Sequence, residues 1–165
     1  MRVLALVVAA LTFPVCSPAI AGEWTRANVS STADGTLETV AKVSGLVDDP
    51  HGARAAELVI TCVGNRTSVF ISADYLVFGG DVARVEYTID NGPTQRSYWK
   101  VCAGDLCAGL WNGAGIPFIR SLLDAAVLRM TLTCTFGRPI YATFAVGGAR
   151  EALKDVRQQC GWSGP

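Results

Sequence analysis

Six cysteines and one histidine are the residues of this sequence best suited to chemistry, and their spacing decides which chemistry is open to them. The histidine, His51, stands in an Asp-Pro-His-Gly stretch, and no Gly-x-Ser-x-Gly elbow accompanies it. No Cys-x-x-Cys pair occurs, so the spacing of a thioredoxin-like redox centre or a zinc site is missing. The candidates for paired carboxylates are Asp48/Asp49, Glu86 and Asp90, but the last two fall on the polar face of one expected strand, where charged residues are expected anyway. We therefore predict no catalytic residue, no cofactor and no metal site, with a small atypical hydrolase as an alternative.

The cysteines fit structural disulfide bonds better. Cys102 and Cys107 flank Ala-Gly-Asp-Leu, whose Gly-Asp pair is typical of a turn, so a hairpin there would bring the two sulfurs together. Cys62 lies in an apolar strand, and Cys160 continues the apolar face of the last expected helix. We predict the bonds Cys102–Cys107 and Cys62–Cys160, with Cys134 as a buried free thiol. A Cys62–Cys134 bond is the competing arrangement.

Alternating apolar residues predict the elements that position these groups. The clearest strand covers 128–136, where every second residue from Leu128 to Phe136 is apolar and the others are polar. A helix is expected to start at Pro117, and apolar residues recur at helical spacing from Gly148 to Gln159. Runs of antiparallel strands with few helices indicate an α+β fold. We predict a mainly antiparallel, β-sandwich-like domain with two short helices and disulfide bonds.

The first residues have the layout of a secretory signal peptide. Arg2 provides a basic start, 3–13 is a largely apolar run, and Ala19-Ile20-Ala21 provides a small-x-small cleavage site. The eleven residues of that run are too few to span a bilayer, which takes about 20. We expect cleavage after Ala21 and a single mature domain over 22–165 that has no transmembrane span and is periplasmic or secreted. A lipid on Cys16 and a buried N-terminal element are the alternatives.

Charge and aromatic residues indicate how the mature domain could bind a partner. The formal net charge is zero with no run of like charges, which argues against nucleic acid or an anionic membrane. Arg96, Tyr98, Trp99 and Trp111 crowd near expected turns, and such residues are frequent anchors in protein interfaces. We expect these four to form an interaction site that the neighbouring disulfide hairpin stiffens. The alternative is that both tryptophans pack under the helix that follows them.

Several segments in a fixed order resemble a known family. They are the hairpin sequence at 57–71, Val85-Glu-Tyr-Thr-Ile-Asp-Asn-Gly-Pro, Pro117-Phe-Ile-Arg-Ser-Leu, Ala142-Thr-Phe-Ala-Val-Gly-Gly and the closing Cys160-Gly-Trp. Over nearly the whole mature chain they resemble the VasI family, also called TagO-like, of periplasmic proteins associated with type VI secretion. The resemblance implies a non-enzymatic envelope accessory protein that acts through protein or cell-wall contacts. Its implied partner is an envelope or secretion-apparatus protein.

The pair Cys102 and Cys107 carries a second resemblance. It lies where a polar turn is expected in the first family, and it is similar to the cysteine hairpin of the invasion-associated locus B family. That family is also exported and also ends in an amphipathic helix. A secreted interaction factor of this type is therefore the alternative function.

Overall fold

The structure, a computed structural model, describes residues 23–30, 36–49, 52–73, 77–133, 139–162 and 164. The expected signal peptide, His51 and Cys134 lie outside these residues. The elements are β1 (Trp24–Ser30), β2 (Leu37–Asp49), β3 (Gly52–Val63), β4 (Arg66–Ser72), β5 (Val82–Ile89), β6 (Gln95–Val101), β7 (Cys107–Leu110), α1 (Ile116–Leu122), β8 (Val127–Thr133), β9 (Pro139–Ala145), α2 (Ala149–Ala152) and α3 (Lys154–Gln159).

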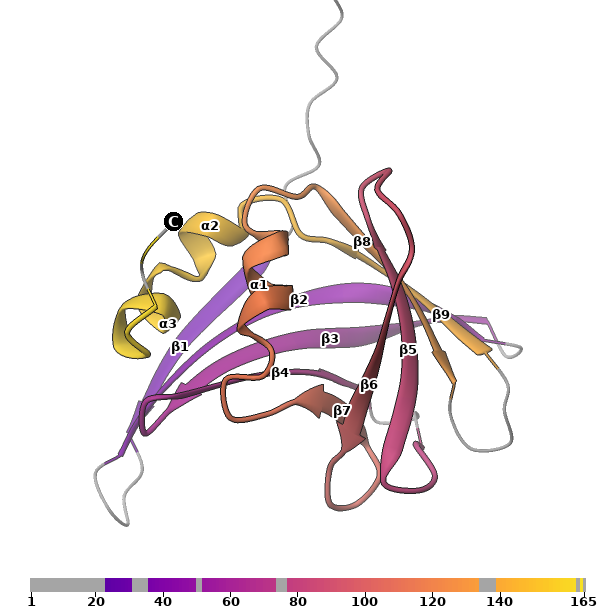
Figure 1. The fold of residues 1–165 in the computed structure, drawn as a ribbon, viewed down its shortest axis with the longest axis horizontal. Coiled ribbons are helices and arrows are strands. Elements are labelled where there is room, and N and C mark those ends of the chain that lie inside the picture. The colour runs from indigo at the N-terminus through magenta and orange to yellow at the C-terminus, as the bar shows by residue number, and fades with distance from the viewer. Residues whose placement is uncertain are drawn as a thin grey trace, which may run out of the picture.

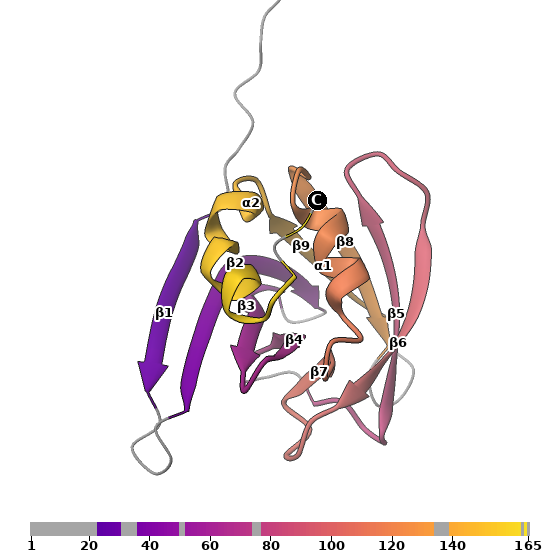
Figure 2. The ribbon, with the colours of Figure 1, turned by 60° about the vertical axis from the view of Figure 1, so that its left-hand side comes forward.

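The strands form one closed antiparallel barrel (Figures 1 and 2). Their order is β1-β2-β3-β4-β7-β6-β5-β8-β9, and β9 also pairs with β2, which joins eight of the nine strands in a ring. Strand β1 stands outside that ring, because it pairs with 37–43 of β2 while β9 pairs with 45–48 of the same edge. The predicted sandwich is therefore wrong, since one continuous sheet curls back on itself, but the strands are mainly antiparallel as predicted.

Alternation along each strand separates the core from the surface. On β8, Leu128, Met130 and Leu132 are buried inside the barrel, while Arg129 between them is exposed. The β3–β4 hairpin turns through Gly64 and Asn65, both with positive φ, as a two-residue turn between right-twisted strands requires.

Closure of the barrel depends on Gly45. This residue lies opposite Phe144 in the β2–β9 pairing, and Phe144 is completely buried. A Cβ atom at position 45 would lie 2.3 Å from Cδ1 of Phe144, so only glycine lets the phenyl ring cross β2 at this point. The ring of strands therefore closes where a missing side chain makes room for a large one.

Among the described residues, three helices rather than the two predicted cover one side of the barrel (Figures 1 and 2). Helix α1 buries Phe118, Ile119 and Leu122. The expected final helix is divided into α2 and α3 at Leu153, whose backbone (φ −93°, ψ 5°) leaves helical geometry while its side chain is fully buried.

Both disulfide bonds expected from the sequence are present in the structure. Cys62 of β3 is bonded to Cys160 at the end of α3, which holds the C-terminal segment against the barrel. Cys102 is bonded to Cys107 across the turn between β6 and β7, where the backbone N–H of Cys102 also donates to the carbonyl of Cys107 at 3.0 Å. The free thiol expected at Cys134 lies outside the described residues.

Candidate interaction surface

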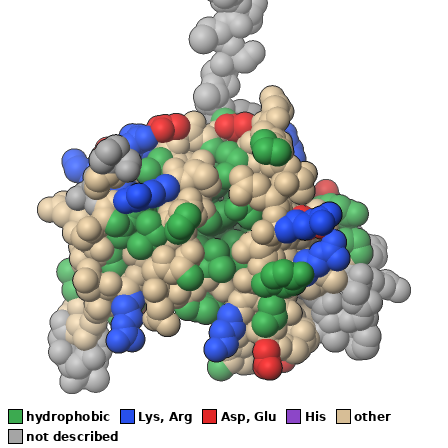
Figure 3. Space-filling view, in the orientation of Figure 1, with side chains coloured by type: hydrophobic (Ala, Val, Ile, Leu, Met, Phe, Trp, Pro, Cys, Tyr) green, Lys and Arg blue, Asp and Glu red, His purple; other side chains and the backbone are tan. Residues whose placement is uncertain are grey.

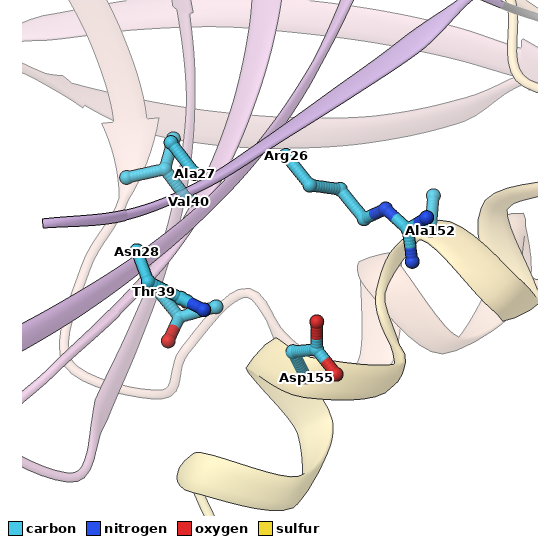
Figure 4. A pocket seen from close by; sticks show the side chains of 7 residues that line it. All are labelled: Arg26, Ala27, Asn28, Thr39, Val40, Ala152 and Asp155. Atoms are coloured by element: carbon cyan, nitrogen blue, oxygen red, sulfur yellow. The ribbon is translucent and has the colours of Figure 1, made fainter.

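The described residues offer little that could support catalysis. Among them, no group of three His, Cys, Asp or Glu side chains could hold a metal ion, and no helix is long and apolar enough to cross a membrane. A pocket of about 90 Å³ lies between β1, β2 and the C-terminal helices, with Arg26 and Asp155 pointing into it (Figure 4). Ligand sites for small molecules usually exceed about 300 Å³. This pocket is smaller than that, whereas open hollows of about 340 and 360 Å³ lie elsewhere on the outer surface of the strands.

The four residues expected to form an interaction site divide between the two faces of the barrel. Trp99 is completely buried, and its ring meets Phe118 of α1 edge-on, with 5.4 Å between ring centroids. Tyr98, its neighbour on β6, is 72% exposed. Successive side chains of a strand point to opposite faces, so both cannot reach one partner. The assignment of Trp99 to the surface is thus corrected, because Trp99 packs in the core under α1. The alternative, which placed both tryptophans under this helix, is right for Trp99 but not for Trp111, which stacks on Phe70.

A carboxylate between two arginines lies on the outer face of β5 and β6. Oε1 of Glu86 accepts hydrogen bonds from Nη2 of Arg84 at 2.6 Å and from Nε of Arg96 at 2.9 Å. The hydrogen bond from Arg84 lowers the pKa of the Glu86 carboxyl and raises the pKa of the Arg84 guanidinium. The arginine side chains remain 55% and 76% exposed, so both guanidinium groups can still donate to an incoming acidic group.

Two aromatic rings continue this outer face onto β4 and the end of β7. Phe70 and Trp111 stack with 5.4 Å between centroids and 26° between planes. The indole N–H of Trp111 donates to the carbonyl of Lys100 at 3.2 Å. Gly109 lies opposite both Phe70 and Lys100, and a Cβ there would lie 2.6 Å from Cβ of Phe70. The glycine therefore leaves room for the Phe70 side chain beside it.

We call this surface the basic–aromatic face. It spans β4, β5, β6 and the end of β7, and Figure 3 shows Lys and Arg side chains next to hydrophobic ones on its right-hand side, where Figure 1 places β5 and β6. The face consists of outward-pointing aromatic and charged side chains: Phe70, Arg84, Glu86, Arg96, Tyr98, Lys100 and Trp111.

Sequence reasoning found three of these residues as interaction candidates and missed the others. Phe70 could have been found, because alternation places the apolar residues Val69 and Ile71 on one face of their strand and Phe70 on the other. Arg84 and Lys100 could not, because their place beside Tyr98 depends on how β5, β6 and β7 pair.

Comparison with known proteins relates the chain to one family and one solved fold. The model of the family described as "Type VI secretion system VasI, EvfG, VC_A0118" matches residues 18–162. A similar solved structure is the crystal structure of invasion associated protein b from Bartonella henselae, with 11% sequence identity and a TM-score of 0.56. The match covers 84% of this chain and 94% of that one, and at this identity it shows a shared fold alone. No relative was found among curated proteins.

Proposed function

This chain belongs to the VasI family of type VI secretion proteins, and we propose that it is a non-enzymatic envelope accessory protein that binds a protein of the secretion apparatus. The observation that carries the proposal is the basic–aromatic face, where exposed arginine and tyrosine lie beside a stacked Phe70–Trp111 pair. Arginine, tyrosine and tryptophan dominate the energetics of protein interfaces. The rigid strands that carry them reduce the ordering cost of binding.

A secreted interaction factor is the second candidate function. The fold shared with invasion associated protein b is compatible with it, as is the same basic–aromatic face. The two candidates differ in where the partner resides. The first requires a partner in the producing cell's own envelope, and the second requires one outside that cell.

Photo-crosslinking from the proposed face tests the interaction. A photoreactive amino acid in place of Tyr98 is expected to crosslink to an envelope component of the secretion apparatus. The same group in place of Leu46, which is 62% exposed on β2, is expected not to do so. Replacing Arg96, Tyr98 and Trp111 together with alanine should weaken capture of that partner about tenfold or more. Equal crosslinking from both positions, or unchanged capture by the triple variant, contradicts the proposal.

Export with removal of 1–21 is part of the same proposal, and it concerns residues outside those described by the structure. We expect the protein isolated from the periplasm or medium to have the intact mass of a chain that begins at Gly22. The two disulfide bonds favour such a compartment, because bonds of this kind persist where the environment is oxidising. A mass that retains Met1, or one that carries a lipid on Cys16, would show the assignment to be wrong.

A further inference from the structure

Four cations stand in consecutive rows on the outside of β6, β5 and β8. A row here is a set of residues opposite one another on neighbouring strands, and adjacent rows on one face are two residues apart. The four side chains point outward, because the residues between them, such as Trp99, Val85 and Leu128, are buried. The rows place Lys100 opposite Val82, Tyr98 opposite Arg84, Arg96 opposite Glu86, and Thr88 opposite Arg129.

The spacing of these rows is that of an extended chain. Alternate residues of an antiparallel strand lie about 6.8 Å apart, so the cations of four successive rows extend over about 20 Å. Each row contributes one cation, from β6, β5, β6 and β8 in turn. Because neighbouring strands are about 4.8 Å apart, the four cations form a staggered band, and we call Lys100, Arg84, Arg96 and Arg129 the basic track.

The outward-facing side chains of β5, β6 and β8 carry more positive than negative charge, although the formal net charge of the whole chain is zero. Among outward-facing residues of β5, β6 and β8, the only carboxylate in the described structure is Glu86, which is engaged by Arg84 and Arg96. Arg129 is exposed at the other end, where Nη1 donates to the carbonyl of Asp90 at 3.0 Å. A formal net charge of zero for the whole chain is therefore compatible with a local surface on β5, β6 and β8 that attracts anions.

A groove runs beside the end of the track. It has a volume of about 340 Å³, lies over β5, β8 and β9, and includes Arg129. Thr131 and Thr143 line it, together with Glu86 and with Tyr141, which is 56% exposed. Such a lining can accept and donate hydrogen bonds along a polypeptide backbone.

We propose that the basic track binds an extended acidic segment of the partner protein, with Asp or Glu at every second position; this rests on the function proposed above. Side chains on one face of an extended peptide repeat about every 6.8 Å, which equals the interval between rows of the track. Arginine binds carboxylates through two parallel hydrogen bonds, so Arg84, Arg96 and Arg129 suit this ligand.

Binding of designed peptides to the mature protein tests this inference. The probes are two fluorescein-labelled peptides of equal composition, one with six Glu alternating with six Thr and the other with six Glu followed by six Thr. By fluorescence anisotropy, the alternating peptide is expected to bind about tenfold more tightly, and its affinity should fall as salt screens the charges. A short heparin oligosaccharide, chosen to match the charge of the peptides, serves as the non-peptide polyanion.

Charge reversal at the two ends of the track provides the matched variant. The double variant Lys100→Glu/Arg129→Glu leaves the Glu86 cluster intact and should weaken the alternating peptide about tenfold or more. The control Arg66→Glu/Arg120→Glu changes the net charge equally at exposed sites off the track and should bind as the wild type does. Circular dichroism checks that both variants fold. The salt dependence of peptide binding is measured on the wild-type protein, so this part of the test does not depend on any variant folding.

Three results overturn the inference. They are equal affinity for the two peptides, tighter binding of heparin than of the alternating peptide, and no measurable binding of either peptide. The function proposed above survives each of them if the crosslinker at Tyr98 still captures a secretion-apparatus protein. Conversely, if the peptides bind as expected but no such crosslink forms, the track is supported as a site for acidic peptides and the proposed secretion-apparatus partner is contradicted.

Discussion

Replacing Trp99 with alanine is expected to lower the free energy of unfolding by about 3–5 kcal/mol. The indole is fully buried and meets Phe118 edge-on, and Phe118 in turn meets Tyr87 edge-on with 5.0 Å between centroids. Phe118 belongs to α1, so this aromatic group holds the helix on the barrel. Removing the indole leaves a cavity under α1 that the rigid strands cannot collapse to fill.

Urea unfolding followed by far-UV circular dichroism measures this loss, and the adjacent residue provides the control. Tyr98→Ala removes a ring of similar size that points outward, and its effect should stay within about 0.5 kcal/mol. Trp99→Phe should fall between the two, because the indole N–H has no acceptor among the described residues and its loss breaks no hydrogen bond. Similar losses for Tyr98→Ala and Trp99→Ala would mean that the faces of β6 are misassigned.

The strand alternation that governs this result was present in the sequence. In the strand over 128–136, Leu128, Met130 and Leu132 were assigned to one face, and the structure buries all three. The same rule applied to Ser97–Val101 separates Tyr98 from Trp99. Side chains of a strand alternate between its two faces, so residues that are adjacent in sequence point in opposite directions. This alternation decides which residues share a surface, and nearness along the chain does not.

Closure of the barrel could not be predicted in the same way. It requires β2 to meet β9, about a hundred residues later, in a register that places Gly45 opposite Phe144. Alternation gives each strand an inner and an outer face, but it does not determine which strands are neighbours. A sandwich and a barrel made of the same strands have the same alternation, so the sequence pattern is compatible with both.

The basic track was hidden for the same reason. Arg84, Arg96, Lys100 and Arg129 come from three strands and are neighbours only through the β5–β6 and β5–β8 registers. The zero net charge of the chain argued against a strongly charged surface. Sequence composition reports total charge, whereas binding depends on how the charges are distributed over the folded surface.

Removing the Cys62–Cys160 bond is expected to lower the free energy of unfolding by about 4–5 kcal/mol. The two cysteines are separated by 98 residues, so the bond restricts most of the unfolded mature chain. In the folded state it holds the C-terminal segment, where the indole N–H of Trp162 donates to Oγ1 of Thr67 at 2.8 Å. Alanine is the suitable replacement at both positions, because Cys62 is fully buried and a serine hydroxyl would lack a partner there.

The second disulfide bond is an internal control for this expectation. Cys102 and Cys107 are separated by only five residues, and the same chain-entropy relation gives about 2 kcal/mol for their loop. Urea unfolding measures the free energy of unfolding of the two variants Cys62→Ala/Cys160→Ala and Cys102→Ala/Cys107→Ala, and peptide mapping verifies that each keeps its other bond. The first variant should lose roughly twice as much free energy of unfolding as the second. Equal losses would mean that restriction of the unfolded chain is not the main source of stability. In that case the C-terminal segment would be held on the barrel mainly by its contacts in the folded state, such as the hydrogen bond from Trp162 to Thr67.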